Sequence, residues 1–367
     1  MRVLIVDSSV AYTGAFKCAL IEAELLTYNG HTFYFVLPQQ STLKPYVEDK
    51  HIKAYMLPML EISKSIKGLF KYIPRLISNT RKLRKIVKAE QIDVVQMNDF
   101  YNMLGFMLRI TGYRGKLVTY VRFLPSSRPA PLRKIWSFIA KHFSDRVIAV
   151  SKTTLQQLPH SKNAICIYDP VFIEEKLPPK TYVQKQVVDI VYQANYIRGK
   201  GQDSALEAFA LAHNQNPNIR LTYIGGDMGL DKNKAFKKQL QDRAIELGLE
   251  NKIHFKGFTQ RIEGDIKDAD ILLNFSESES FSMTCIEASY YGTALIATRC
   301  GGPEEIIIDG ETGFLVPLHD HQAMANAILK LANSYELRIA FAKAAKKTVM
   351  KRFPPEKFVA EMEDALK

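Results

Sequence analysis

Residues 271–298 read ILLNFSESESFSMTCIEASYYGTALIAT, and this stretch decides the fold. Its two ends, 271–275 and 294–298, are short apolar runs of the kind that form buried strands. A loop and a helix-length segment closed by Gly292 lie between them. Two strands joined through a helix pair in parallel, because the connection has to cross back over the sheet. The stretch therefore predicts one βαβ unit of a parallel sheet.

The same alternation of strands and helices runs through the rest of the chain. Further runs that predict strands lie at 3–6, 31–37, 93–97, 116–121, 146–150, 189–193, 220–224 and 253–255. Helical patterns separate them, among them 99–111 and 131–143. This order is typical of an α/β fold with doubly wound parallel sheets. A length of 367 residues fits two such domains, at roughly 100 to 200 residues each.

The domain boundaries follow from breaks in this pattern. We expect the first domain to span residues 1–170 and the second to span 187–352. Residues 171–186 carry Pro178-Pro179 without clear periodicity, which is typical of a linker. The prolines of Phe353-Pro354-Pro355 should end a long helix. We expect the amphipathic helix at 353–367 to cross back to the first domain.

The excess of basic residues lies in the first half of the chain. The net charge is +12, but residues 1–180 hold 27 Lys and Arg against 13 Asp and Glu, whereas residues 181–367 hold 23 against 25. This asymmetry favours an anionic partner for the first domain, such as a nucleotide, a phospholipid surface or a nucleic acid.

The remaining composition bears on the compartment. The four cysteines lie far apart and form no C-x-x-C pair, so neither a zinc cluster nor a disulfide framework is indicated. The apolar stretch at 3–6 is too short for a signal peptide, and no uncharged apolar run approaches the roughly 18 residues of a membrane span. We expect a cytoplasmic protein, which could still lie peripherally on the inner face of the plasma membrane.

Two glutamates flank a predicted helix N-terminus in the opening stretch. Open α/β sheets bind ligands at the loops that follow their strands. Glu279 lies in such a loop, and Glu287 lies one or two turns into the next helix. The backbone N–H groups between them should form an anion site at the start of that helix. They belong to Ser280, Phe281, Ser282 and Met283. Taken alone, both glutamates could equally be ordinary charges near a helix end.

Three more motifs follow in order: TALIAT at 293–298, GGPEEI at 301–306 and DGETGFLV at 309–316. With the two glutamates, they resemble the nucleotide-sugar-binding domain of the retaining glycosyltransferases of family 4, in the type that builds bacterial cell-surface polysaccharides and lipopolysaccharide. The resemblance covers the whole second domain. It implies a GT-B fold, in which two Rossmann-like domains face a central cleft.

The resemblance also implies a reaction. The enzyme would be of the hexosyltransferase type and would move a sugar from a UDP- or GDP-linked donor on the second domain to a glycan or lipid-linked acceptor on the first. Transfer would retain the anomeric configuration and would need no metal or other cofactor. The leaving diphosphate would itself take the acceptor proton.

The family's roles carry over residue by residue. Glu279 would contact the donor sugar, Glu287 would hold the ribose, and the four amides would bind the distal phosphate. The chain departs from the family where Ser280 and Ser282 stand in place of glycines. A serine still offers its N–H group but restricts φ. This departure leaves the donor sugar open.

A second motif, NYIRGKGQD at 195–203, follows the strand at 189–193. The family uses an arginine and a lysine to neutralise the diphosphate leaving group, because fixed cations stabilise the charge that develops there. Lys200 matches the lysine, and Asn195 occupies the arginine position. Arg198 replaces that arginine if the loop turns back. The alternative is that Lys200 is a solvated loop lysine.

Two residues of the first domain complete the predicted site. Gly14 matches a glycine where the family lets a backbone amide approach the donor phosphate. Arg122 follows the strand at 116–121, where the family often has a histidine. We count Arg122 as catalytic beside Glu279 and Lys200, in contact with an anionic acceptor or the donor, although it cannot act as a neutral base. The alternative is a structural pair with an acidic loop residue.

Two patterns resemble metal sites but do not predict one. Asp268-Ala-Asp270 precedes a strand rather than following one. His319-Asp-His321 lies just before a helix, where Asp320 is a natural N-cap. We expect no metal site.

The segment 62–88 is basic and amphipathic. One helical face carries Ile62, Ile66, Leu69, Phe70, Ile73 and Ile77, and the opposite face carries Lys64, Lys67, Lys71 and Arg75. Pro74 and Ser78-Asn-Thr80 suggest a break before Arg81 and the lysines and arginines that follow. Docking on an anionic membrane surface and a core-packing face with a solvated basic side are both open.

Two other function classes compete with the transferase. One is a catalytically weakened GT-B protein that acts as a nucleotide-sugar-binding or assembly partner, which Asn195, Ser280 and Ser282 would suit. The other is a nucleic-acid binder that uses the basic half. The sequence carries no recognition motif or stacking aromatic series for it, and we do not expect it.

Overall fold

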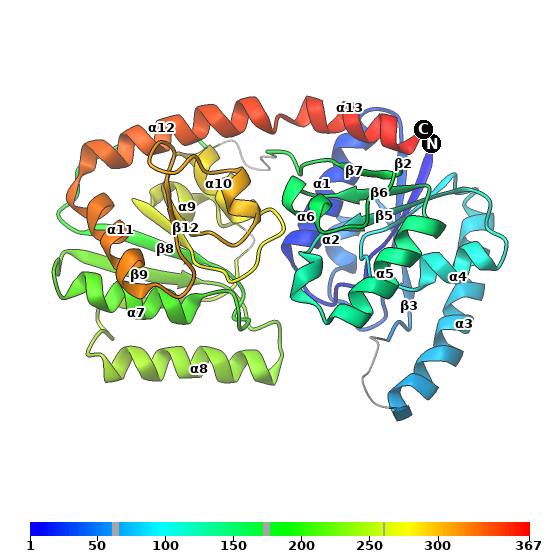
Figure 1. Ribbon diagram of the computed structural model, residues 1–367, viewed down its shortest axis with the longest axis horizontal. Coiled ribbons are helices and arrows are strands. Elements are labelled where there is room, and N and C mark those ends of the chain that lie inside the picture. The colour runs from blue at the N-terminus through cyan, green and yellow to red at the C-terminus, as the bar shows by residue number, and fades with distance from the viewer. Residues whose placement is uncertain (61–65, 172–176, 260) are drawn as a thin grey trace. The chain divides into compact units, whose positions relative to one another are not determined.

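A computed structural model describes residues 1–60, 66–171, 177–259 and 261–367, with the backbone alone at 66–69. The chain forms two compact units, each built on a parallel sheet (Figure 1). Unit 1 comprises residues 1–169 and 355–367, and unit 2 comprises residues 170–354.

Unit 1 is a seven-stranded sheet in the order β3-β2-β1-β4-β5-β6-β7 with helices on its faces. The strands are β1 Arg2–Val6, β2 Thr32–Pro38, β3 Lys53–Leu57, β4 Val94–Met97, β5 Lys116–Val121, β6 Arg146–Ala149 and β7 Ala164–Cys166. The helices are α1 Gly14–Thr27, α2 Lys44–Glu48, α3 Ile66–Ala89, α4 Leu104–Ile110, the 3-10 turn η1 Pro125–Ser127, α5 Ala130–Phe143, α6 Lys152–Gln156 and α13 Pro355–Leu366. The last helix packs on α1, and the Tyr120 hydroxyl lies 3.0 Å from the sulfur of Met362.

Unit 2 is a six-stranded sheet in the order β10-β9-β8-β11-β12-β13. The strands are β8 Val188–Gln193, β9 Ile219–Ile224, β10 Ile253–Lys256, β11 Ile271–Asn274, β12 Ala294–Thr298 and β13 Phe314–Val316. The helices are α7 Gln202–His213, α8 Asp231–Glu246, α9 Glu263–Asp268, α10 Met283–Tyr291, the 3-10 turn η2 Gly302–Glu305, α11 His321–Asn333 and α12 Tyr335–Arg352.

The predicted fold class is confirmed, since both sheets are parallel and helices connect their strands. The three strands that the sequence did not predict, β3, β7 and β13, lie at sheet edges and are short or partly exposed. The helix expected from residue 99 begins only at Leu104. Asp99 and Asn102 are instead used in a loop, where their side chains bond the backbone and hydroxyl of Ser8 at 2.7 and 2.8 Å.

The predicted break in the basic segment is wrong. Helix α3 runs from Ile66 to Ala89 with Pro74 inside it. A proline removes one hydrogen bond to the preceding turn, and here that turn, residues 70–73, is largely exposed. The polar residues that suggested a break have partners: Asn79 donates to the Pro58 carbonyl at 3.1 Å, and the Thr80 hydroxyl donates to the Leu76 carbonyl at 2.7 Å.

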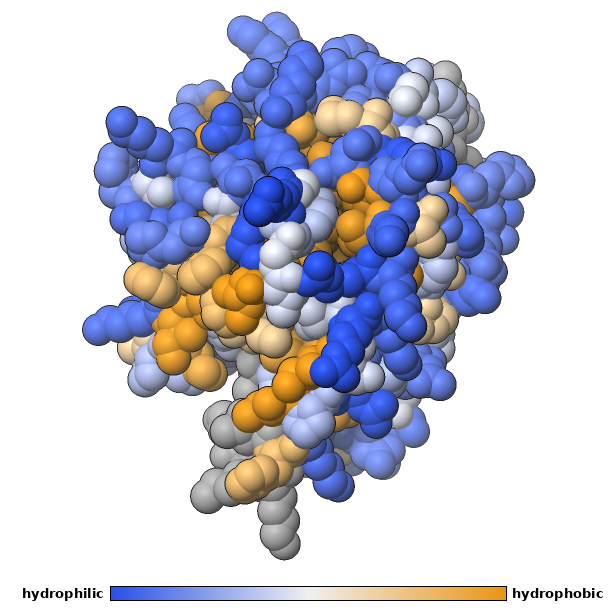
Figure 2. All heavy atoms as spheres, turned by 90° about the vertical axis from the view of Figure 1, so that its right-hand side faces the viewer, coloured by the Kyte–Doolittle hydropathy of each residue, from blue (hydrophilic) through white to orange (hydrophobic). Residues whose placement is uncertain are grey.

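Unit 1 has an apolar face on three helices that pack in series, α3 against α4 and α4 against α5. The Phe70 side chain is 75% exposed, so this part of the predicted stripe does not pack into the core. We define the apolar face as Phe70, Ile73, Ile77, Ile110, Ile135 and Phe138, all exposed. Figure 2 shows apolar atoms among hydrophilic ones on this side of the molecule. Of the predicted stripe, Ile62 and Lys64 lie outside the described residues, as do the side chains of Ile66, Lys67 and Leu69.

Candidate functional site

The strand order of each sheet marks where a ligand would bind. In unit 2 the order reverses between β8 and β11, and open α/β sheets bind ligands beyond the strand ends at such a reversal. The loops that leave this point are 194–201 and 275–282. They carry Lys200 and Glu279, so the fold brings the two predicted motifs together.

Lys200 and Glu279 form an ion pair across these loops. The Lys200 Nζ lies 2.8 Å from Glu279 Oε1, and the side chains are 35% and 16% exposed. Ser276 donates its hydroxyl to the same carboxylate oxygen at 2.8 Å. Burial lowers the pKa of Lys200, but the Glu279 carboxylate outweighs it and raises that pKa overall. The pair is therefore a charged, oriented and partly open site rather than a solvated loop lysine.

Two glycines allow the loops to come this close. Gly201 has φ +75°, and a Cβ there would lie 1.9 Å from the Phe275 carbonyl oxygen. A Cβ on Gly302 would lie 2.1 Å from the Phe281 carbonyl oxygen, and the Gly302 N–H donates to the Glu279 carbonyl at 2.8 Å. A side chain at either position would push apart the loop that carries Lys200 or the loop that carries Glu279.

Helix α10 begins beside this pair, in a conformation that suits glycine. Ser282 is its N-cap and has φ +108°, although serine rarely adopts a positive φ. The Asn274 side chain donates to the Ser282 hydroxyl at 2.9 Å and holds it in place. The serine at this predicted position thus takes a backbone conformation that glycine adopts more readily. Phe281 and Met283 flank Ser282, and Ser280 precedes them, so the four residues of the predicted anion site run up to the first residue of α10.

The predicted anion site uses the backbone amide of Phe281 and not its side chain. Its side chain is 2% exposed and packs edge-to-face on Phe353 with ring centroids 5.1 Å apart. It therefore anchors the loop, and only its backbone can face a ligand.

Glu287 lies one turn into α10 and is buried, at 8% exposure. Gln193, the last residue of β8, donates to its carboxylate at 3.5 Å. The two glutamates thus lie on one helix N-terminal region, with Glu279 paired to a lysine and Glu287 beside an amide.

The structure does not bring Asn195 or Arg198 to the ion pair. Asn195 accepts from the Gly226 N–H at 3.1 Å and fastens the loop after β8 to the loop after β9. Arg198 turns from its loop onto α8, where it donates to Gln239 at 2.6 Å and lies over the Phe236 ring at 4.9 Å. Lys200 is therefore the cation that these loops hold toward Glu279 in the described part of the chain.

Gly14 opens α1 in unit 1. The hydroxyl of its N-cap, Thr13, accepts from the Phe16 N–H at 3.2 Å. A Cβ on Gly14 would meet nothing within 4 Å, and φ is not positive. The fold itself does not require a glycine here.

Arg122 does not fit the predicted contact with a substrate. Its side chain is 5% exposed, and its guanidinium holds the Asp169 carboxylate at 2.7 and 3.0 Å. It also donates to Asn98 at 2.7 Å and lies 3.6 Å from Glu22. Burial raises the pKa of Glu22 to about 7, although Arg122 opposes this shift. The structural pair with an acidic residue, which the sequence had left open, is the arrangement observed.

Sequence reasoning missed the residues that hold the site in shape. Gln193, Asn274 and Ser276 end or follow strands at the reversal point, and this position is the signal that could have found them. In unit 1 the corresponding reversal lies between β1 and β4. There Asp7 accepts from Asn98 at 2.5 Å, and burial with the neighbouring Asp7 charge raises the pKa of Asp99 to about 7.

The described residues contain no group of three or more His, Cys, Asp and Glu that could hold a metal ion. None of the helices in the described ranges is both long and apolar enough to cross a membrane.

Two family models match the chain. Residues 12–164 match Glycosyltransferase Family 4, and residues 174–348 match Glycosyl transferases group 1. Each match falls within one of the two units.

Curated relatives and solved structures agree with this. The putative glycosyltransferase EpsD of Bacillus subtilis is 31% identical over 52% of this chain and 48% of its own length, so the chain spans about half of that relative. The N-acetyl-alpha-D-glucosaminyl L-malate synthase of Bacillus anthracis is 24% identical over 83% and 82%. The crystal structure of Anabaena Alr3699/HepE in complex with UDP and glucose has a TM-score of 0.83 at 20% identity and covers 100% and 99% of the two chains. At that identity the likeness shows the fold.

Proposed function

We propose that this chain moves a sugar from a nucleotide-sugar donor to a glycan or lipid-linked acceptor. The premise is its place among the glycosyltransferases, through its family 4 and group 1 domains. The observation that carries the proposal is the Lys200–Glu279 pair, which lies where the unit 2 sheet reverses and a nucleotide would bind. UDP is the first nucleotide to test, because similar folds have been solved with UDP.

Each residue of the pair has its own part in the proposed reaction. A departing nucleoside diphosphate gains negative charge, and the ammonium of Lys200 would stabilise it. The first amides of α10 would bind the distal phosphate. Glu279 would then be released from Lys200 to accept hydrogen bonds from the sugar hydroxyls. Glu287 would hold the ribose.

We further propose retention of the anomeric configuration without a metal. The leaving diphosphate would take the acceptor proton, so that the protein need supply no base. This fits the position of Arg122, which is buried and cannot serve as one.

The two glutamates should separate transfer from nucleotide binding. Glu279→Gln keeps the size of the side chain and its bond from Ser276 but removes the charge, and should lower transfer far more than affinity for the nucleoside diphosphate. Glu287→Gln should weaken diphosphate binding about tenfold, the loss of one charge-assisted hydrogen bond. Calorimetric titration with UDP, beside transfer assays, checks both. Equal losses of UDP affinity in the two variants would contradict these roles.

We also propose that unit 1 docks on an anionic membrane through its apolar face. Large apolar side chains are rarely exposed together on a soluble surface. The same helices expose Lys71, Arg75 and Lys134, and each cation near an anionic surface adds about 1 kcal/mol. A lipid-linked acceptor would be reached from this position.

Membrane docking predicts binding that depends on charge. Wild-type protein should sediment with vesicles that contain anionic lipid, and should be released by salt as the Debye length falls below roughly 8 Å. Lys71→Glu with Arg75→Glu should abolish sedimentation, because two attractive charges become repulsive. The matched control, Lys232→Glu with Lys347→Glu, makes the same charge change on exposed residues of unit 2 and should sediment like wild type. If the control variant loses sedimentation to the same extent, or if the wild-type protein stays in solution at low salt, unit 1 does not dock on the membrane.

A further inference from the structure

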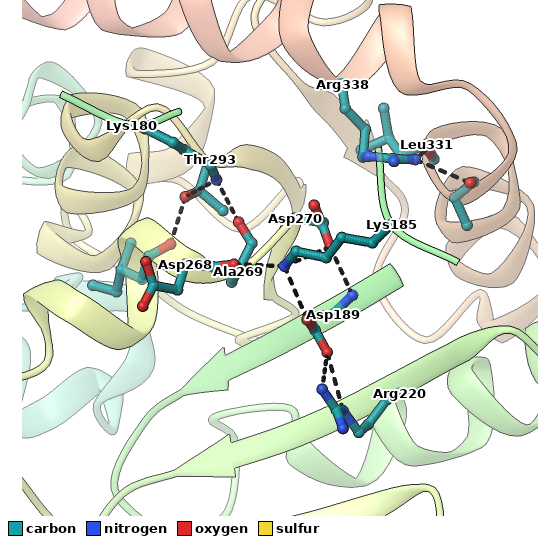
Figure 3. Close-up of polar contacts among 12 residues, drawn as sticks. Lys180, Lys185, Asp189, Arg220, Asp268, Ala269, Asp270, Thr293, Leu331 and Arg338 are labelled. Carbon is teal, nitrogen blue, oxygen red and sulfur yellow. Dashed lines mark hydrogen bonds and ion pairs between the residues drawn. The ribbon is translucent and has the colours of Figure 1, made fainter. Parts of the chain in front are cut away.

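Unit 2 has a cavity at the edge of its sheet where the strands begin. Its volume is about 360 Å³, within the range of small-molecule sites. It lies among the connecting segment at 180–185, the junction of α9 with β11, and α12 (Figure 3). Asp270 and Gly292 line it immediately before β11 and β12, whereas the Lys200–Glu279 pair follows the far ends of β8 and β11. A strand of four residues spans roughly 13 Å, so the cavity and the donor site are separate.

Lys180 brings a partly buried positive charge to this cavity. Its Nζ donates to the Ala269 carbonyl and, at 3.2 Å, to the Thr293 hydroxyl (Figure 3). An ammonium has three donors, so one is left. No carboxylate pairs with Lys180 in the described part of the chain. Burial accordingly lowers its pKa to about 8.

Arg338, on α12, brings a second positive charge to the cavity. It is 5% exposed, and its Nη1 donates to the carbonyls of Leu331 and Ala332 at 2.6 and 2.9 Å, at the end of α11. Its Nε and Nη2 make no hydrogen bond to any residue that the structure describes, and the side chain lines the cavity. Burial lowers the pKa of Arg338 as well, because nothing fully compensates its charge.

The acidic residues nearby are already engaged or exposed. Asp270 pairs with Lys185 at 3.2 Å and accepts from the Asp189 N–H at 2.9 Å (Figure 3). Asp268 is exposed. Four cations line the cavity, Lys180, Lys185, Lys267 and Arg338, against the two carboxylates of Asp268 and Asp270. The walls thus carry a net charge of +2, and cations withdrawn from water are costly unless an anion compensates their charge.

We propose that this cavity binds the phosphate group of a small metabolite, held by Lys180 and Arg338. A phosphate dianion would neutralise the net charge of the walls. Its oxygens would accept hydrogen bonds from the N–H groups of Lys180 and Arg338 that have no other acceptor among the described residues. Tyr182, Tyr335 and Ile339 also line the cavity and would contact the organic part of a phosphate monoester. Because Lys180 and Tyr182 belong to the segment that precedes β8, the ligand would also fasten this segment to the sheet.

Phosphate-dependent thermal stabilisation tests the site. Inorganic phosphate should raise the melting temperature of the full chain more than chloride does at equal ionic strength. A sugar phosphate should bind more tightly than inorganic phosphate if the side chains that line the cavity contact its organic part. Lys180→Met should weaken phosphate binding about tenfold, the loss of one charge-assisted hydrogen bond. Its melting temperature without phosphate serves as its own reference, since the change removes both a desolvated charge and the donor to the Ala269 carbonyl. Lys330→Met, at an exposed lysine over the Phe314 ring, is the matched control and should bind phosphate like wild type.

Lys200→Ala separates this cavity from the donor site, which is also expected to attract phosphate. The proposal requires that the phosphate effect survive in Lys200→Ala and be lost in Lys180→Met. The reverse pattern would place phosphate at the donor site and overturn the proposal. Equal stabilisation of wild type and Lys180→Met, or none in wild type, would overturn it as well. A sugar phosphate no tighter than inorganic phosphate would limit the ligand to phosphate itself.

Discussion

Lys200→Ala should lower the turnover of sugar transfer about 100-fold, which corresponds to roughly 3 kcal/mol of transition-state stabilisation. Lys200 is the cation held at the reversal of the unit 2 sheet, 2.8 Å from Glu279. Charge on the diphosphate grows as the sugar leaves, so the loss should appear mainly in kcat and less in the affinity for the donor. Steady-state kinetics with the cognate nucleotide sugar would measure both. Lys200→Arg should recover part of the rate, because it restores the charge with another shape.

Arg198→Ala is the matched control for this prediction. Arg198 lies two residues away but contacts Gln239 and Phe236 on α8, so its removal should leave kcat nearly unchanged. A loss in Arg198→Ala as large as that in Lys200→Ala would mean that the loop rearranges around the donor. Unchanged turnover in Lys200→Ala would remove Lys200 from the site.

Arg122→Met should cost unit 1 about 3 to 5 kcal/mol of unfolding free energy, since it leaves the Asp169 and Glu22 carboxyls buried without their cation. The chain has one tryptophan, and Trp136 lies in the core of unit 1. Its fluorescence during urea unfolding therefore reports this unit. A substrate-contacting arginine would instead lose activity without loss of stability.

A matched variant separates this pair from ordinary arginine contacts. Arg128 lies over the Phe123 ring at 5.2 Å without an ion pair among the described residues, and Arg128→Met should cost less than about 1 kcal/mol. Asp169→Asn combined with Arg122→Met should cost less than the sum of the single changes, because the charges compensate each other. A loss under about 1 kcal/mol for Arg122→Met, or strict additivity with Asp169→Asn, would contradict the assigned role.

The buried strands were the part of the fold that could be predicted from the sequence. Mostly apolar runs such as 116–121 and 294–298 coincide with β5 and β12, because strands buried on both faces are largely apolar. The edge strand β3 reads KAYML and is only partly buried, so it lacks that signal. The break expected at Pro74 was wrong because a proline disfavours a helix without always ending it, and α3 continues through Pro74.

The candidate site also has a part that could be predicted from the sequence and a part that could not. Loops after strands could be predicted, and the structure brings Lys200 to Glu279 through them. Which polar side chains are satisfied internally could not be predicted, because this depends on residues distant in sequence. Arg122 meets Asp169 from 47 positions away, and Arg198 meets Gln239 from 41. Ser282 has φ +108° and its hydroxyl accepts from Asn274, an arrangement that no spacing rule reveals.

Hydrogen exchange in the presence of a nucleoside diphosphate tests the central claim most directly, namely that the loops after β8 and β11 hold the donor. UDP and GDP, each at about 1 mM, the upper end of usual enzyme–substrate affinities, would be compared with the free protein by mass spectrometry of peptides. The account predicts that one of them protects residues 194–201 and 275–287, and that Lys200→Ala reduces this protection. Protection confined to other segments, or none with either nucleotide, would contradict it.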